Sequence, residues 1–212
     1  MHNHFHSNPD LRPAGERFFV RSEAGEDVPL RRIRLSDTPE CFGGGRNPDF
    51  FMTDVTGGYG AADAGETVEL VRRERPEPGS PTQLAAARAG VVTPEMAYAA
   101  ARENANLEGF AASLSEPGLE RVRDRLMPLL ERVEPWTGER VRARVAARQA
   151  VIPAAFTHPE VEPTVIGRHF ATKVNANVGT SASSSDWREE GRKMQEALAR
   201  GADTVMDLST GR

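Results

Sequence analysis

Two kinds of hydrophobic pattern divide the chain. Stretches with partly alternating apolar positions, at residues 28–35 and 50–55, predict short β-strands near the N-terminus. Further along, apolar side chains recur every three or four positions, which predicts helices. The first helix has a clear start, because Thr93 is a good N-cap, Pro94 suits the first helical position and Glu95 places an acid in the first turn.

Two further helical stripes follow the first helix. Apolar residues repeat at helical spacing through residues 119–133, and another helix is predicted to begin near Thr137, with Val141 and Val145 on its inner side. Stripes of this type are far more often part of a core than of a cofactor site, so we interpret them as core.

The C-terminal stretch predicts strand, helix and strand. Residues 169–178 alternate enough to form a strand, Asp186 offers an N-cap, and Gly201 suits the position after a helix. Residues 202–208 form a short apolar strand, and a right-handed crossover makes the two strands parallel neighbours. The pattern therefore predicts an α/β fold. It leaves open whether this unit begins a larger barrel or belongs to a small domain whose sheet edge the N-terminal region covers.

Asn177 closes the first of these two strands, and Met206 lies near the end of the second. Ligands bind at the C-terminal ends of strands in parallel α/β folds, which makes both residues candidates for ligand contact. An amide offers a donor and acceptors, and a thioether offers polarizable contact to a flat ring. The structural alternative is that Asn177 caps a strand end and Met206 belongs to the core.

Composition excludes several classes of function. The sequence has 212 residues, a net charge of -4 and one cysteine, Cys41. It therefore has no basic excess to attract nucleic acid, no internal disulfide and no self-contained iron–sulfur cluster. No apolar stretch is long enough to span a bilayer, and we expect a cytoplasmic protein. Histidines occur at positions 2, 4 and 6 and again at His158, but we assign neither a metal site nor a catalytic base to them.

Five segments occur in one order along residues 28–212 and carry a resemblance to a known family: VPLRRIRLSDTP, TQLAAARAGVVTPEMAYAAARENAN, ARQAVIPAAFTHPEVEPTVIGRHF, KVNANVGTSASSS and GADTVMDLSTGR. Together they resemble the phosphomethylpyrimidine synthases, which are radical S-adenosylmethionine (SAM) enzymes of thiamine biosynthesis. The resemblance implies a carbon–carbon lyase that converts aminoimidazole ribonucleotide into hydroxymethylpyrimidine phosphate.

The resemblance also implies an architecture. The polar residues 1–27 predict a flexible lead-in, and the resemblance implies a mixed helical N-terminal domain over 28–150 and the first βαβ unit of an incomplete (βα)8 TIM-type barrel over 151–212. Asn177, in the NAN motif, and Met206, in TVMDLS, are implied to contact the substrate. It places no catalytic residue and no metal ligand in this sequence.

The family uses a 4Fe–4S cluster, S-adenosylmethionine and zinc. Its cluster cysteines and zinc histidines have no counterpart in this sequence, so we expect the chain alone to bind none of these cofactors and to be inactive. We expect aminoimidazole ribonucleotide as the small-molecule partner, and a second copy or a complementary C-terminal half as the protein partner. Nucleic acid and membrane are not expected partners. The alternative function is a non-catalytic assembly or partner-binding module derived from the same family.

Overall fold

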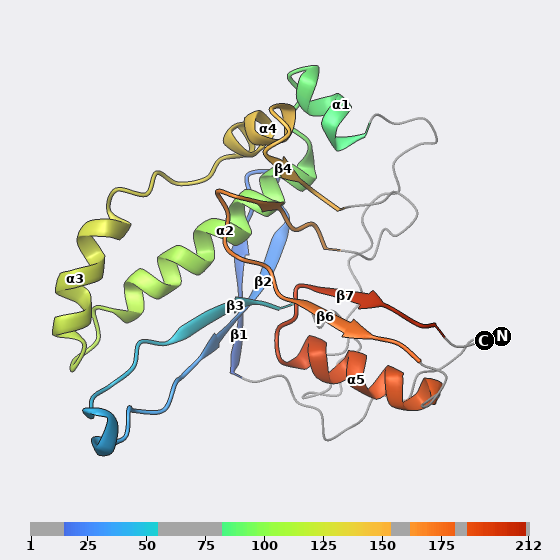
Figure 1. Ribbon diagram of the computed structural model, residues 1–212. Coiled ribbons are helices and arrows are strands. Elements are labelled where there is room, and N and C mark those ends of the chain that lie inside the picture. Colours follow the sequence, from blue (N-terminus) through green and yellow to red (C-terminus); the bar gives the residue numbers. More distant parts are fainter. Residues whose placement is uncertain (1–14, 55–81, 154–161, 181–185, 211–212) are drawn as a thin grey trace. The chain divides into compact units, whose positions relative to one another are not determined.

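The computed structural model describes residues 15–54, 82–153, 162–180 and 186–210. These residues form a mixed α/β structure that divides into two compact units (Figure 1). The first, which we call the sheet-and-helix unit, contains the described residues from 15 to 53 and from 82 to 171; the second, the βαβ unit, contains residue 54 and the described residues from 172 to 210. Predictions for the histidines at positions 2, 4, 6 and 158 lie outside the described residues.

An antiparallel sheet opens the sheet-and-helix unit. Its strands are β1 (Glu16–Arg21), β2 (Asp27–Ile33) and β3 (Phe50–Thr53), in the order β1-β2-β3. Phe18 lies opposite Leu30, and Val20 lies opposite Val28, so one face of the sheet is apolar. The two strands predicted near the N-terminus are thus present. The strand β1 lies within residues 1–27, which were predicted to be a flexible lead-in. This part of the lead-in forms a strand because its apolar residues pair with those of β2.

Helix α2 (Pro94–Ser113) is packed on two sides. It starts as predicted: Thr93 Oγ1 accepts a hydrogen bond from Met96 N at 3.3 Å, and Pro94 occupies the first turn. Tyr98 and Ala105 pack against β2, whereas Met96 faces a second cluster of buried residues. Alanine on both faces of α2 lets neighbouring elements approach closely.

The second cluster joins α2 to α1 (Gln83–Arg88), α4 (Gly138–Ala146) and β4 (Ala150–Val151), and it includes Val165 directly before β5 (Ile166–Gly167). Trp136 stacks on Phe170, with ring centroids 4.2 Å apart. The buried Glu103 accepts a hydrogen bond from Ala171 N at 2.8 Å. These contacts hold the segment before Thr172 in the sheet-and-helix unit, whereas the family resemblance implied a barrel that begins at residue 151.

Helix α3 (Glu120–Leu130) departs from the predicted core stripe. None of its residues is buried, and Leu129 and Val133 are 56% and 45% exposed. Its contacts are with α2, next to a groove of about 200 Å³ that Leu107, Met127 and other residues of both helices line. Helical periodicity predicted the helix correctly, and Leu119 at the start of the stripe is buried, but the rest of the stripe is not core because too few elements pack around α3.

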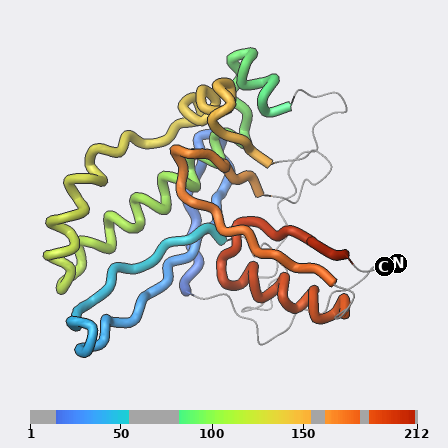
Figure 2. Tube along the Cα trace, viewed as in Figure 1, coloured from blue at the N-terminus to red at the C-terminus, as the bar shows by residue number. Residues whose placement is uncertain are grey.

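The βαβ unit consists of β6 (Asn175–Val178), α5 (Trp187–Ala199) and β7 (Thr204–Asp207). The strands β6 and β7 are parallel neighbours, as predicted, and α5 lies along them (Figures 1 and 2). Asp186 caps α5 by accepting a hydrogen bond from Arg188 N at 2.9 Å. Gly201, with φ of 88°, follows the helix in the left-handed conformation expected of that position. The prediction of a parallel strand–helix–strand unit is therefore confirmed, but the first strand begins at Asn175 and not at residue 169, because Phe170 packs into the second buried cluster.

Candidate functional site

Asn177 and Met206 lie side by side. They are register partners in the parallel ladder of β6 and β7, one residue before the last pair of the two strands. Asn177 is exposed and Met206 is 50% exposed, so Met206 is not a core residue. The pair therefore stands at the carboxyl ends of adjacent parallel strands, where α/β folds bind ligands.

The two faces of β6 differ in what they expose. Asn175 and Asn177 are exposed, whereas Ala176 and Val178 between them are partly buried. Successive residues of a strand point to opposite faces. Since α5 packs against β6, we place the apolar residues on the helix side and the two asparagines on the open side. The open face of the strand pair is thus polar, with the thioether of Met206 beside it.

Two further side chains join Asn177 on this face. Thr204 Oγ1 donates a hydrogen bond to Asn175 Oδ1 at 2.8 Å, and Asn175 Nδ2 donates to Asn177 Oδ1 at 2.9 Å. Neither Asn175 nor Thr204 was identified from the sequence. The signal that could have found Asn175 is the i, i+2 spacing of the two asparagines, which places both on one face of a strand.

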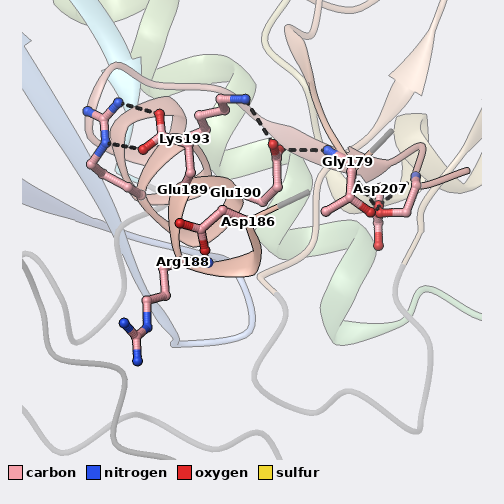
Figure 3. Close-up of polar contacts among 10 residues, drawn as sticks. Gly179, Asp186, Arg188, Glu189, Glu190, Lys193 and Asp207 are labelled. Atoms are coloured by element: carbon pink, nitrogen blue, oxygen red, sulfur yellow. Dashed lines mark hydrogen bonds and ion pairs between the residues drawn. The ribbon is translucent and has the colours of Figure 1, made fainter. Parts of the chain in front are cut away.

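A carboxylate of α5 holds the backbone just after β6. Glu190 Oε2 accepts a hydrogen bond from Gly179 N at 2.8 Å, and Lys193 Nζ lies 2.8 Å from Glu190 Oε1 (Figure 3). The Gly179 amide and, after it, the Lys193 ammonium lower the pKa of Glu190, because both stabilise its charged form. This contact fixes the point where the chain leaves β6 for the loop that leads to α5.

The end of β7 is fixed against the same region. Leu208 N donates to Val178 O at 2.8 Å, and Thr180 N donates to Ser209 Oγ at 3.1 Å. Asp207 Oδ1 accepts hydrogen bonds from both the hydroxyl and the amide of Ser209, which lowers the pKa of Asp207. Gly179 makes this approach possible: a Cβ on it would lie 2.6 Å from Ser209 N.

The described side chains of the open face can bind a ligand, but none of them is suited to proton transfer. These side chains are amides, a hydroxyl and a thioether, and the nearby Asp207 is engaged by Ser209. Within the described ranges, no three His, Cys, Asp or Glu side chains come together as a metal site. Cys41 is exposed and is the one cysteine of the sequence, so the residues present do not fit an iron–sulfur cluster, which needs several thiolates. No helix in the described part of the chain is long and apolar enough to cross a membrane.

Comparison with protein families gives a match over the C-terminal part of the chain. The model of the radical SAM ThiC family matches residues 82–212, which is more than half of the chain. The chain belongs to the radical SAM ThiC family. The matched range includes α2, the second buried cluster and the whole of β6–α5–β7, and therefore also Asn177 and Met206.

Family membership establishes the function at a general level. The ThiC family is a family of radical SAM enzymes of thiamine biosynthesis, and its full-length members use S-adenosylmethionine and an iron–sulfur cluster. The resemblance inferred from the sequence motifs is thereby confirmed. The match covers the motifs from TQLAAARAG onward, whereas VPLRRIRLSDTP lies before it.

Proposed function

We propose that this chain supplies the first part of a phosphomethylpyrimidine synthase, in which Asn177 and Met206 contact aminoimidazole ribonucleotide. The reaction of the whole protein would convert this ribonucleotide into hydroxymethylpyrimidine phosphate by carbon–carbon lyase chemistry. One observation carries the proposal: the two residues are register partners on the open face at the carboxyl ends of β6 and β7, within the range that matches the family.

The chemistry of the open face suits this ligand. An amide can hydrogen-bond to an imidazole nitrogen, a ribose hydroxyl or a phosphate oxygen. The Met206 thioether can lie against a flat ring without requiring a fixed direction of contact. The face carries no nucleophile or base, so we assign these residues to binding and orientation of the ribonucleotide and not to the chemical step.

The radical chemistry belongs to groups outside this sequence in our proposal. S-adenosylmethionine and a 4Fe–4S cluster would supply the radical chemistry in the whole protein, and a single cysteine cannot hold that cluster. The strands that would extend β6 and β7 into a (βα)8 barrel, and the zinc site, would likewise come from a complementary C-terminal part. We therefore expect no product from this chain alone.

Titration of the isotope-labelled chain with aminoimidazole ribonucleotide tests the proposal. Amide resonances at residues 176–178 and 205–207 should shift, together with the Asn177 side-chain amide. Asn177→Ala should weaken binding by about 3- to 10-fold, the loss of one ordinary hydrogen bond. Arg200→Ala is the control, because Arg200 is exposed and follows the C-terminal end of α5, whereas the loop from the carboxyl end of β6 leads to its N-terminal end. Absence of any shift at millimolar ribonucleotide would refute the proposed contact.

The alternative of an assembly module gives a different result in the same sample. It predicts no ribonucleotide-dependent shift, together with self-association that light scattering detects. A monodisperse monomer that shifts with the ribonucleotide would exclude it.

A further inference from the structure

The hydrogen bonds on the open face run in one direction. Thr204 Oγ1 has a single hydrogen and donates it to Asn175 Oδ1 at 2.8 Å. With its oxygen engaged on the Thr204 side, the Asn175 amide turns its Nδ2 toward Asn177 Oδ1, 2.9 Å away. We call this arrangement the Thr204–Asn175–Asn177 relay.

The relay decides which end of the Asn177 amide is available. An asparagine side chain has one oxygen that accepts and one nitrogen that donates. In Asn177 the oxygen is engaged by Asn175, while Nδ2 donates to no residue that the structure describes. Because Asn177 and Met206 are register partners, this free donor lies on the same face as the exposed thioether.

We propose that Asn175 is a positioning residue, which together with Thr204 holds Asn177 so that its Nδ2, and not its oxygen, faces the bound ribonucleotide. This inference rests on the proposed function and sharpens it. The ligand atom that meets Asn177 must then be an acceptor: an unprotonated ring nitrogen, a ribose oxygen or a phosphate oxygen. An exocyclic amino group cannot accept from Nδ2 and would share Asn177 Oδ1 with Asn175, so the relay favours a ligand orientation that presents an acceptor to Nδ2.

The register of the two strands makes the relay possible. Asn175 and Thr204 are direct partners across the parallel ladder, although they are 29 residues apart in the chain. A slip of one residue would bring Thr204 opposite Ala176 and turn every side chain of the slipped strand to the other face. The hydrogen bond from Leu208 N to Val178 O holds this register at the ends of the two strands.

The relay itself can be tested without any ligand. In the full chain, Thr204→Val removes the hydroxyl donor while it keeps the shape of the side chain. The side-chain amide resonances of both Asn175 and Asn177 should shift, although Thr204 has no direct hydrogen bond to Asn177. Thr172→Val is the matched control, since it makes the same chemical change at an exposed residue outside both strands. An unchanged Asn177 side-chain amide in Thr204→Val would overturn the relay whether or not the chain binds a ligand.

Binding of aminoimidazole ribonucleotide then tests the direction of the amide. Asn175→Ala should weaken binding by about 3- to 10-fold when Asn177 is present, and should have no further effect in the Asn177→Ala background. Asn177→Asp replaces the donor with a second acceptor, so it should bind more weakly than Asn177→Ala. An Asn177→Asp chain that binds as well as Asn177→Ala, or better, would overturn the proposed direction.

The outcomes separate the two proposals. If the unchanged chain binds no ribonucleotide, the proposed function fails and the ligand orientation fails with it. If the unchanged chain binds but the Asn175→Ala and Thr204→Val chains bind equally well, the proposed function stands and the positioning role of Asn175 is overturned.

Discussion

The two compact units handle their apolar surface in opposite ways. In the sheet-and-helix unit, α2 is enclosed from two sides, and Leu30 and Met96 are fully buried. Among the described residues of the βαβ unit, the buried hydrophobic residues are only Ala199 and Ala202. The first unit thus derives its stability from a filled interior, whereas the second leaves one face of a strand pair open. That open face is where Asn177 and Met206 lie.

A leucine substitution in each unit should give the largest difference in the loss of stability between the two units. Leu30→Ala removes a fully buried side chain and should destabilise the sheet-and-helix unit by about 2–5 kcal/mol. Leu208→Ala, at a residue that is 52% exposed, should change stability by no more than about 0.5 kcal/mol. Urea unfolding followed by fluorescence measures both, because Trp136 reports on one unit and Trp187 on the other. Equal losses would contradict the contrast between the units.

A methyl group at Gly179 should disrupt the βαβ unit at its ligand-facing end. Gly179 has φ of 146°, and a Cβ would meet the backbone of Leu208 and Ser209. We expect Gly179→Ala to cost about 3 kcal/mol, from strain and overpacking together. Gly90→Ala is the control in the other unit, with φ of 81° but no atom within 4 Å of the new Cβ, and should cost only about 1 kcal/mol. Hydrogen exchange of Leu208 N should accelerate in Gly179→Ala alone; similar exchange in both variants would show that crowding is not the cause.

Two helix ends allow a finer comparison. Helices α4 and α5 both end with a left-handed residue, which is Arg148 (φ of 59°) in one unit and Gly201 in the other. Gly201→Ala should destabilise the βαβ unit by about 1 kcal/mol. Arg148→Gly should stabilise the sheet-and-helix unit by roughly 0.5 kcal/mol, because relief of strain exceeds the added entropy of glycine in the unfolded chain. Thermal unfolding of the two variants measures both signs, and destabilisation by Arg148→Gly would contradict the strain.

The smallest expected effect is a pH dependence at the end of β6. The pKa of Glu190 is lower in the folded chain than in the unfolded chain. The stability that its carboxylate contributes is therefore complete above the unfolded pKa of about 4.3, and it is lost as the pH falls through the lower folded pKa. The Gly179 amide resonance should therefore titrate with a midpoint below about 4.3. Glu190→Gln should abolish this titration. Glu189→Gln should preserve it, since Glu189 pairs with Arg192; loss of the titration in both variants would implicate another group.

Local sequence signals predicted the helices and strands better than they predicted which elements pack against them. The start of α2 followed from Thr93 and Pro94, and the parallel βαβ unit followed from strand patterns and Gly201. By contrast, the apolar stripe of residues 119–133 predicted a helix but did not predict that most of its side chains are exposed or only partly buried. Periodicity reports which residues share a face of a helix, and it does not report whether other elements cover that face.

The residues of the candidate site were likewise predicted only in part. Asn177 and Met206 were identified from their positions at strand ends and from the family resemblance, and the structure makes them register partners. Asn175 and Thr204 were missed, because their hydrogen bond joins residues 29 positions apart. Only the pairing of β6 with β7 brings such residues together.

The sequence by itself determined the family, the βαβ unit and the identity of two residues at its strand ends. Alternation along β6 also defines two faces, with Ala176 and Val178 on one and the asparagines on the other. Only the tertiary structure decided that α5 leaves the asparagine face open and that Thr204 directs the Asn175 amide toward Asn177. The reason is that local pattern fixes the direction of side chains within a strand, whereas strand register and helix packing fix what those side chains meet.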